Sequence, residues 1–307
     1  MDQFAARVSR IRRVVPPGYA LWAAVLTPRH GRCRFCRPPS GWFTLRAFAT
    51  SAVLCLALLT ACRAVASAQD TVFFPPPNRI AVRDMRAVSA VDLSDRVHIR
   101  TIVGPTSSVS VGELDSGAVV PAHHHTREQA DITLRGQMTV TLGSHVAALP
   151  TGVGVLIPID VTHSLENPGP GRTLAIEFHT VPRPDLVPPR TPITFPSAAV
   201  DAPVGDVSRL IARMNADSGA TLDGSACEVR WRTVRTAVDV HPAPTPTEWF
   251  VYVARGMAEV EAAGASVPIR EGMLLMVPAS MAHVRLRAVG NSGVNVIEFH
   301  VRPHGGT

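Results

Sequence analysis

The sequence contains no lysine, so all 30 of its basic residues are arginines. Aromatic residues make up only 5% of the chain, and cysteine occurs five times. Residues 1–68 hold ten arginines and one acid, whereas the rest of the chain has 20 arginines and 23 acids. The net charge of +6 therefore belongs to the N-terminal segment, and the remainder lacks the basic surface that a nucleic-acid partner requires.

The N-terminal segment is expected to direct export. Ala47–Ala61 is an uncharged, mostly apolar run that ends in small residues, as in a secretory signal. Its 15 residues are short for a membrane span, which needs roughly 20. Two processing sites stay open: a lipobox-like sequence before Cys62, which would carry a lipid anchor, and a signal-peptidase-like Ala66–Ala68. Residues 1–70 are thus predicted to be a basic extension and leader of a periplasmic or lipid-anchored bacterial protein.

Beyond the leader, the composition favours strands. Val, Ile, Leu and Ala dominate between glycines and prolines, which is typical of many short strands, and only Val207–Met214 suggests a helix. A chain of 307 residues can also form two domains. We therefore expect an all-β protein with two domains.

The two halves of the chain repeat each other. Four pairs of residues are offset by 120 positions: Gly136 and Gly256, Gly152 and Gly272, Pro158 and Pro278, and His163 and His283. The closing segments Ile176–His179 and Ile297–His300 agree with a slip of one residue. Val181–Pro203, with seven prolines, suits an extended linker. These patterns predict two copies of one β-domain, at residues 78–188 and 198–307.

The first copy contains residue types that bind metal ions. His123 and His125 alternate along a predicted strand, so their side chains point the same way, and Gln129 continues that alternation. His163 approaches from another strand after a turn opened by Pro158. Neutral imidazoles and an amide oxygen suit a divalent transition metal such as zinc, manganese, iron or nickel.

The fourth ligand has two candidates. Glu128 is chemically the better ligand, whereas strand alternation and the six-residue gap to Gly136 favour Gln129. If Gln129 is the ligand, Glu128 would be a solvated acid at the entrance of the strand. Asp131 falls on the same inner face as Gln129 and is a candidate acid or base.

These segments resemble the two conserved motifs of the cupin family, G-x5-H-x-H-x3,4-E/Q-x6-G and G-x5-P-x-G-x2-H-x3-N. Gly117–Gly136 matches the first motif throughout, and Gly152–Asn167 departs from the second only at Asp160, where the family usually has glycine. The resemblance implies two tandem jelly-roll β-barrels. It also implies that His123, His125, Gln129 and His163 hold a metal ion.

The second copy lacks these ligands, because Ala243, Thr245 and Trp249 stand at the positions of the two first histidines and the glutamine. Only His283 persists. We expect a degenerate cupin domain that stabilises the first copy, contributes to its pocket wall or mediates a homodimer.

The last strand of the first copy resembles that of small cupins that open unsaturated uronates in pectin and alginate breakdown. In that resemblance Glu177 stands for a catalytic aspartate, His179 for an aromatic residue, and Arg183 for the arginine that meets the substrate carboxylate. A second interpretation puts Glu177 on the outer face of the strand and pairs Arg183 with Asp185.

Four neutral ligands leave the double positive charge of the ion uncompensated. We therefore expect a Lewis-acid enzyme of isomerase, lyase or ring-opening type that acts on a small anionic or sugar-derived substrate. Glu177 or Asp131 would move a proton. A metal-dependent dioxygenase and a non-catalytic exported binding module are the alternatives.

Overall fold

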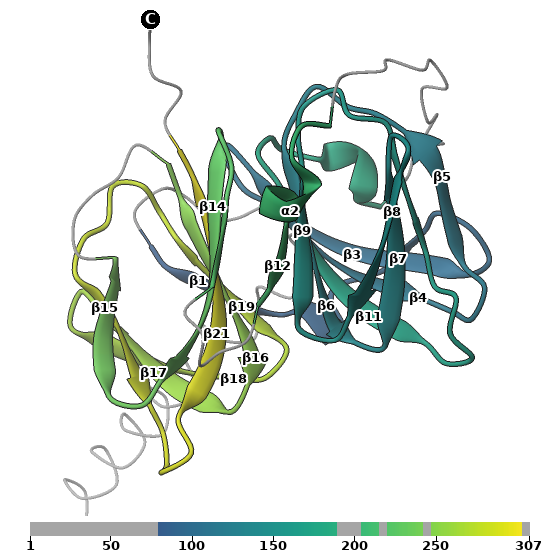
Figure 1. Ribbon diagram of the computed structural model, residues 1–307. Helices are drawn as coiled ribbons and strands as arrows, with labels where there is room; N and C mark the ends of the chain where they lie inside the picture. Colours follow the sequence, from purple (N-terminus) through teal and green to yellow (C-terminus); the bar gives the residue numbers. More distant parts are fainter. Residues whose placement is uncertain (1–78, 189–203, 215–219, 242–246, 303–307) are drawn as a thin grey trace, which may run out of the picture. The chain divides into compact units, whose positions relative to one another are not determined.

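The computed structural model describes residues 79–188, 204–214, 220–241 and 247–302 (Figure 1). The predicted leader, Cys62 and most of the predicted linker lie outside these residues. Almost all regular structure is β, as the composition predicts. Within the described ranges, no helix has the length and hydropathy that a membrane crossing requires.

The first copy forms two sheets, which we call the first sandwich. Its seven-stranded sheet has the order β12-β9-β6-β11-β4-β3-β2, and its four-stranded sheet has the order β5-β10-β7-β8. The strands are β2 (Val91–Asp92), β3 (Val97–Val103), β4 (Ser108–Leu114), β5 (Val119–His123), β6 (Gln129–Arg135), β7 (Gln137–Leu142), β8 (His145–Pro150), β9 (Val153–Ile157), β10 (His163–Glu166), β11 (Thr173–His179) and β12 (Ile211–Arg213).

The second copy forms the second sandwich in the same way. Its sheets have the orders β1-β19-β16-β21-β14-β13 and β15-β20-β17-β18. Closure of either sandwich into a barrel stays a prediction, as do the domain ranges. The strands are β1 (Ala81–Asp84), β13 (Thr221–Asp223), β14 (Cys227–Val234), β15 (Ala237–His241), β16 (Trp249–Arg255), β17 (Met257–Ala262), β18 (Ala265–Arg270), β19 (Met273–Val277), β20 (Val284–Ala288) and β21 (Val294–Val301).

Three apolar clusters hold this arrangement together. One lies between the sheets of each sandwich, where strand residues alternate toward the core. The third joins the large sheets of the two sandwiches, and its centre is aromatic. The Phe178 ring stacks on Phe299 with centroids 4.9 Å apart and meets Phe250 edge-on at 6.4 Å.

The sandwiches also exchange strands. The segment that precedes the first sandwich pairs as β1 with β19 of the second, and β12, which precedes the second sandwich, pairs with β9 of the first. Figure 1 shows the blue β1 among the green and yellow strands. The predicted helix at Val207–Met214 is wrong beyond its first turn: α2 (Val207–Leu210) ends where Ile211 enters the sheet opposite Val155. Edge pairing outweighs the weak helical pattern there.

A buried carboxylate joins the first sandwich to the second. Glu128 is 3% exposed, and its two oxygens accept hydrogen bonds from the backbone N–H groups of Ser225 at 2.8 Å, Ala226 at 2.7 Å and Cys227 at 3.1 Å. The Ser225 hydroxyl is a fourth donor. The expectation that Glu128 is a solvated acid is therefore wrong. Its partners lie almost 100 residues further along the chain, where no local pattern indicates them.

The repeat produces the reciprocal contact. Glu248, the counterpart of Glu128, is 2% exposed and accepts hydrogen bonds from the Thr106 N–H at 2.8 Å and from the hydroxyls of Thr106 at 2.6 Å and Ser107 at 2.8 Å. Gly104 and Gly224 lie against the two carboxylates, and a Cβ at either position would clash with one of them. The repeated glycines thus allow each glutamate to approach the opposite sandwich.

Candidate metal centre

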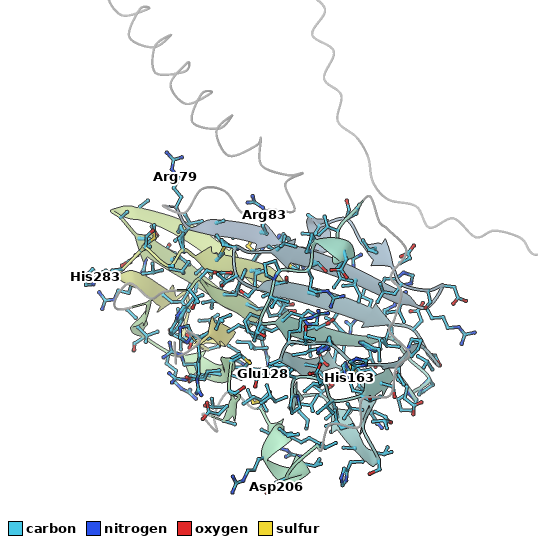
Figure 2. All side chains as sticks on the ribbon, turned by 90° about the horizontal axis from the view of Figure 1, so that it is seen from above. Arg79, Arg83, Glu128, His163, Asp206 and His283 are labelled. Carbon is cyan, nitrogen blue, oxygen red and sulfur yellow. The ribbon has the colours of Figure 1, made fainter. Side chains whose placement is uncertain are left out.

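Three imidazoles converge in the first sandwich. His123 ends β5 and lies opposite His163 at the start of β10, while His125 follows in the loop toward β6. One nitrogen from each ring lies within 4.8 Å of the others. Figure 2 shows His163 inside the teal part of the molecule, and its side chain is 1% exposed. The strand predicted to carry both histidines ends at His123, so His125 joins the group from the loop and His163 joins it from another strand.

Backbone carbonyls orient all three rings. The three Nδ1 atoms lie within hydrogen-bond distance of a carbonyl oxygen two residues away: His123 of Pro121 at 2.8 Å, His125 of Arg127 at 2.8 Å, and His163 of Val161 at 2.9 Å. If Nδ1 carries the proton and donates to the carbonyl, the lone pair of the neutral imidazole is on Nε2. A metal-bound histidine usually donates its other ring N–H in this way.

The rings are neutral at physiological pH. Burial is the largest influence on both inner histidines, lowering the pKa of His125 to about 4 and that of His163 to about 3. His163 Nε2 is buried and has no hydrogen-bond partner among the described residues. A buried acceptor of this kind costs free energy unless a ligand satisfies it.

Gln129 completes the group, at the first position of β6. Its side-chain Nε2 donates to both carboxyl oxygens of Asp131, at 3.2 and 3.0 Å, which turns Oε1 toward His125. Oε1 then lies 2.7 Å from His125 Nε2. With His125 protonated at Nδ1, two lone pairs face each other, and a cation beside them would relieve the repulsion. The donor set therefore fits a divalent transition metal held by three imidazoles and one amide oxygen.

The turn before His163 keeps its geometry despite the departure from the family motif. Asp160 has a φ of 60°, the left-handed conformation that asparagine and aspartate adopt more readily than most residues. Its N–H donates to the His125 carbonyl at 2.9 Å. Asp160 thus ties the turn to the loop that carries His125.

Glu177 faces the centre rather than the outer surface. It lies on β11 directly opposite Asp131 on β6, and its side chain is 17% exposed. With His123, Gln129 and Arg183 it lines a cavity of about 40 Å³ that is otherwise apolar. The interpretation that placed Glu177 on the outer face is therefore wrong.

The two acids differ in charge. Burial alone would raise the pKa of Glu177, but His179 and Arg183 outweigh it and lower that pKa to about 2. For Asp131, burial and the neighbouring Glu177 raise the pKa well above its usual range. Glu177 is consequently the acid of the pair that ionises more readily.

His179 and two arginines support Glu177 from behind. His179 is fully buried, and its Nε2 lies beside Glu177 Oε1. Burial lowers the pKa of His179 to about 4, so the ring is neutral at physiological pH. Arg127 donates to His179 Nδ1 at 3.3 Å, which leaves the proton on Nε2, facing Glu177. Arg183 pairs with Asp185 at 2.7 Å, as the second interpretation had it, and its Nη1 lies 3.1 Å from His179 Nε2. Arg127 was not predicted, although it stands between two predicted ligands.

The second sandwich does not repeat the centre among its described residues. Trp249 takes the place of Gln129 opposite the closing histidine, and Val251 takes that of Asp131 opposite the closing glutamate. The match of His283 with His163 is wrong in space. The turn has one extra residue, so Val284 pairs with His241 as His163 pairs with His123. His283 is exposed with a φ of 58° and lies at the edge of the molecule in Figure 2.

Comparison with known proteins gives one family match. Residues 110–177 match the family model of the cupin domain. No curated protein sequence matches the chain significantly.

Solved structures share the fold at low sequence identity. The protein YlbA from E. coli has a TM-score of 0.56 and 8% identity, over 78% of this chain and 97% of its own. A putative glyoxylate-induced protein from Pseudomonas aeruginosa has a TM-score of 0.55 and 14% identity, over 76% and 96%. A mutant of Bacillus subtilis oxalate decarboxylase has a TM-score of 0.51 and 12% identity, over 76% and 80%. Residues 110–177 thus match the cupin domain, and these solved structures share the fold of the chain.

Proposed function

We propose that the first sandwich is a metal-dependent enzyme of Lewis-acid type that acts on a small carboxylate substrate. The observation that carries the proposal is the cavity that Glu177, ionised at neutral pH, shares with His123, Gln129 and Arg183. Glu177, a candidate base, and Arg183, a candidate partner for a substrate carboxylate, thus lie beside the side chains that would hold the metal ion. This combination is typical of sites that remove or return a proton next to a carboxylate.

The charge balance supports an anionic substrate. The ion would supply a Lewis acid when held by the three histidines and Gln129. Glu177 offsets part of the charge of the ion, so the expectation of an uncompensated ion needs revision. Arg127 adds a positive charge, whereas Arg183 is largely balanced by Asp185. The centre would still be positive overall. A substrate carboxylate would meet Arg183 at the cavity wall.

The two acids would have different tasks. Ionised Glu177 would accept a proton at its carboxylate and return it, while the N–H of neutral His179 holds that carboxylate in place. Asp131 would act by orientation, since both its oxygens are occupied by the Gln129 amide. We therefore assign the base to Glu177 and a positioning role to Asp131.

The cavity size favours a small substrate. About 40 Å³ accommodates only a few waters, because one water needs roughly 10–15 Å³. Leu186, in the 3-10 turn η2 (Pro184–Leu186), forms part of its wall. Two structural neighbours carry names of two-carbon carboxylates, oxalate and glyoxylate, and the decarboxylase is described with Mn(II) centres. These compounds are the first substrates to test.

The test combines metal analysis with turnover. Protein loaded separately with manganese, zinc, iron or nickel is offered oxalate, glyoxylate and unsaturated uronates while an oxygen electrode records consumption. We expect turnover without stoichiometric oxygen uptake. Glu177→Gln should lose at least about a hundredfold in kcat and keep the metal, whereas Glu298→Gln, its counterpart in the second sandwich, should keep both. Stoichiometric oxygen uptake would favour the dioxygenase, and tight substrate binding without turnover would favour the binding module.

A further inference from the structure

A second cavity lies between the two sandwiches, away from the metal centre. Its volume is about 350 Å³, and four arginines line it together with Tyr252: Arg86, Arg100, Arg135 and Arg172. Arg135 ends β6, the strand that begins with Gln129. At about 3.3 Å per residue, the cavity is therefore about 20 Å from the metal centre.

The charges around this cavity do not balance. Arg86 and Arg270 pair with Asp84, Arg100 pairs with Glu113, and Arg172 pairs with both Glu113 and Asp115. These pairs comprise four arginines and three acids. Glu271 and Arg135, which also line the cavity, bring the group to five arginines and four acids. The group thus lacks one negative charge.

Three donors around the cavity have no partner among the described residues. Arg100 Nε is buried and makes no hydrogen bond. The Arg135 side chain is exposed and makes neither a hydrogen bond nor an ion pair within the ranges the structure covers. The Tyr252 hydroxyl likewise donates to no acceptor among the described residues. Burial raises the pKa of Tyr252 to about 12, so its O–H stays available as a donor. Donors of this kind fit an anionic acceptor.

Glu113 and Glu271 also line the cavity, and the side chains of the remaining wall are apolar. This apolar part is formed by the side chains of Met85, Val111, Leu134, Leu174 and Ala254. A cavity of a few hundred Å³ with an apolar wall and a few converging polar groups is typical of a small-molecule site.

The repeat does not impose this cluster. By the offset of the repeat, the counterparts of Arg100 and Glu113 are Ala220 and Thr233. Among the charged residues of the wall, Arg135 does have a counterpart, Arg255, at the end of β16. Arg100 and Glu113 therefore have no charged counterparts in the second copy.

We propose that this cavity binds a small organic monoanion, a carboxylate attached to an apolar body. Its carboxylate meets Arg100, Arg135 and the Tyr252 hydroxyl, and its apolar body covers Leu134 and Leu174. The proposal is independent of the reaction at the metal centre.

The experiment is calorimetric titration of the full chain, loaded with metal, using hexanoate as the probe. We expect saturable binding that weakens at least about tenfold in Arg135→Gln, because a charge-assisted contact is lost. Arg255→Gln is the matched control and should bind as the wild type does. Acetate, which lacks the apolar body, should bind at least about tenfold more weakly than hexanoate.

Two further measurements separate this cavity from the metal centre and from misfolding. Hexanoate binding should persist in His123→Ala, and its loss there would assign the anion to the metal and overturn the proposal. Arg100→Gln should weaken binding at an unchanged far-UV spectrum. Equal affinity in wild type and Arg135→Gln, equal loss in Arg255→Gln, or equal affinity for acetate and hexanoate would each contradict the proposal.

Discussion

Replacing Glu128 with alanine should destabilise the protein strongly and leave metal binding intact. The carboxylate is 3% exposed and accepts from three backbone N–H groups of the second sandwich and from the Ser225 hydroxyl. Alanine removes every acceptor at once. Among the described residues, no hydrogen bond joins the Glu128 side chain to the three imidazoles, so the metal ligands keep their partners.

The magnitude follows from the donors left behind. A buried N–H without an acceptor costs about 1–3 kcal/mol, and three such groups set an upper limit near 9 kcal/mol. Water entering beside Ser225, whose N–H is only partly buried, reduces this figure. We therefore expect a loss of about 3–5 kcal/mol, which is the usual effect of removing one partner from a buried charged network. Total stabilities of about 5–15 kcal/mol make this loss easy to measure.

Urea unfolding followed by tryptophan fluorescence measures the loss, and elemental analysis of the same preparations measures the metal. Gln129→Ala is the matched control. This variant of the adjacent residue should show the opposite result: a small change in unfolding free energy and a large loss of metal. A Glu128→Ala variant that loses its metal, or one destabilised by less than about 1 kcal/mol, would refute our assignment of the two adjacent residues.

Three further results are expected. Glu248→Ala should destabilise the protein somewhat less than Glu128→Ala, because two of its three donors are hydroxyls that can turn toward water; urea unfolding measures the difference, and an equal or larger loss would contradict it. Asp131→Ala should weaken metal affinity by about 10–100-fold in competition with a chelator, since the Gln129 amide loses its orientation, and Asp131→Asn should restore most of it. The folded-state pKa of Glu177 is lowered to about 2 from an ordinary value of 4.5, so its contribution to stability is complete above about pH 5 and lost as pH falls toward 2. Glu177→Gln should flatten that part of the stability curve, and an unchanged curve would argue against the shift.

The sequence predicts which histidines converge, because their spacing follows a local motif. The motif spacing selects His123, His125 and Gln129. The strand alternation expected to link them is interrupted, since β5 ends at His123 and β6 begins only at Gln129. The structure brings His163 to them from another strand, as the motif spacing indicates. Asp160 stands where the motif usually has glycine, and the turn is kept because aspartate tolerates the left-handed conformation.

The errors concern contacts between distant segments. The partners of Glu128 lie on a loop of the second sandwich, and no pattern near position 128 indicates them. The pairing of β1 and β12 could not be predicted for the same reason, since each pairs with a strand of the opposite sandwich. His283 shows a different limit: one extra residue in the turn leaves it exposed just before β20, and Val284 takes the pairing position that corresponds to His163.

The most direct test of the metal centre is the metal content of His163→Ala compared with that of His283→Ala. Both variants and the wild type are stripped with a chelator, reloaded with manganese or zinc, and analysed for metal per chain. We predict one tightly held ion in the wild type and in His283→Ala, and loss of that ion in His163→Ala. Full occupancy in His163→Ala, or loss of the ion in His283→Ala, would contradict the assignment of the centre to the first sandwich.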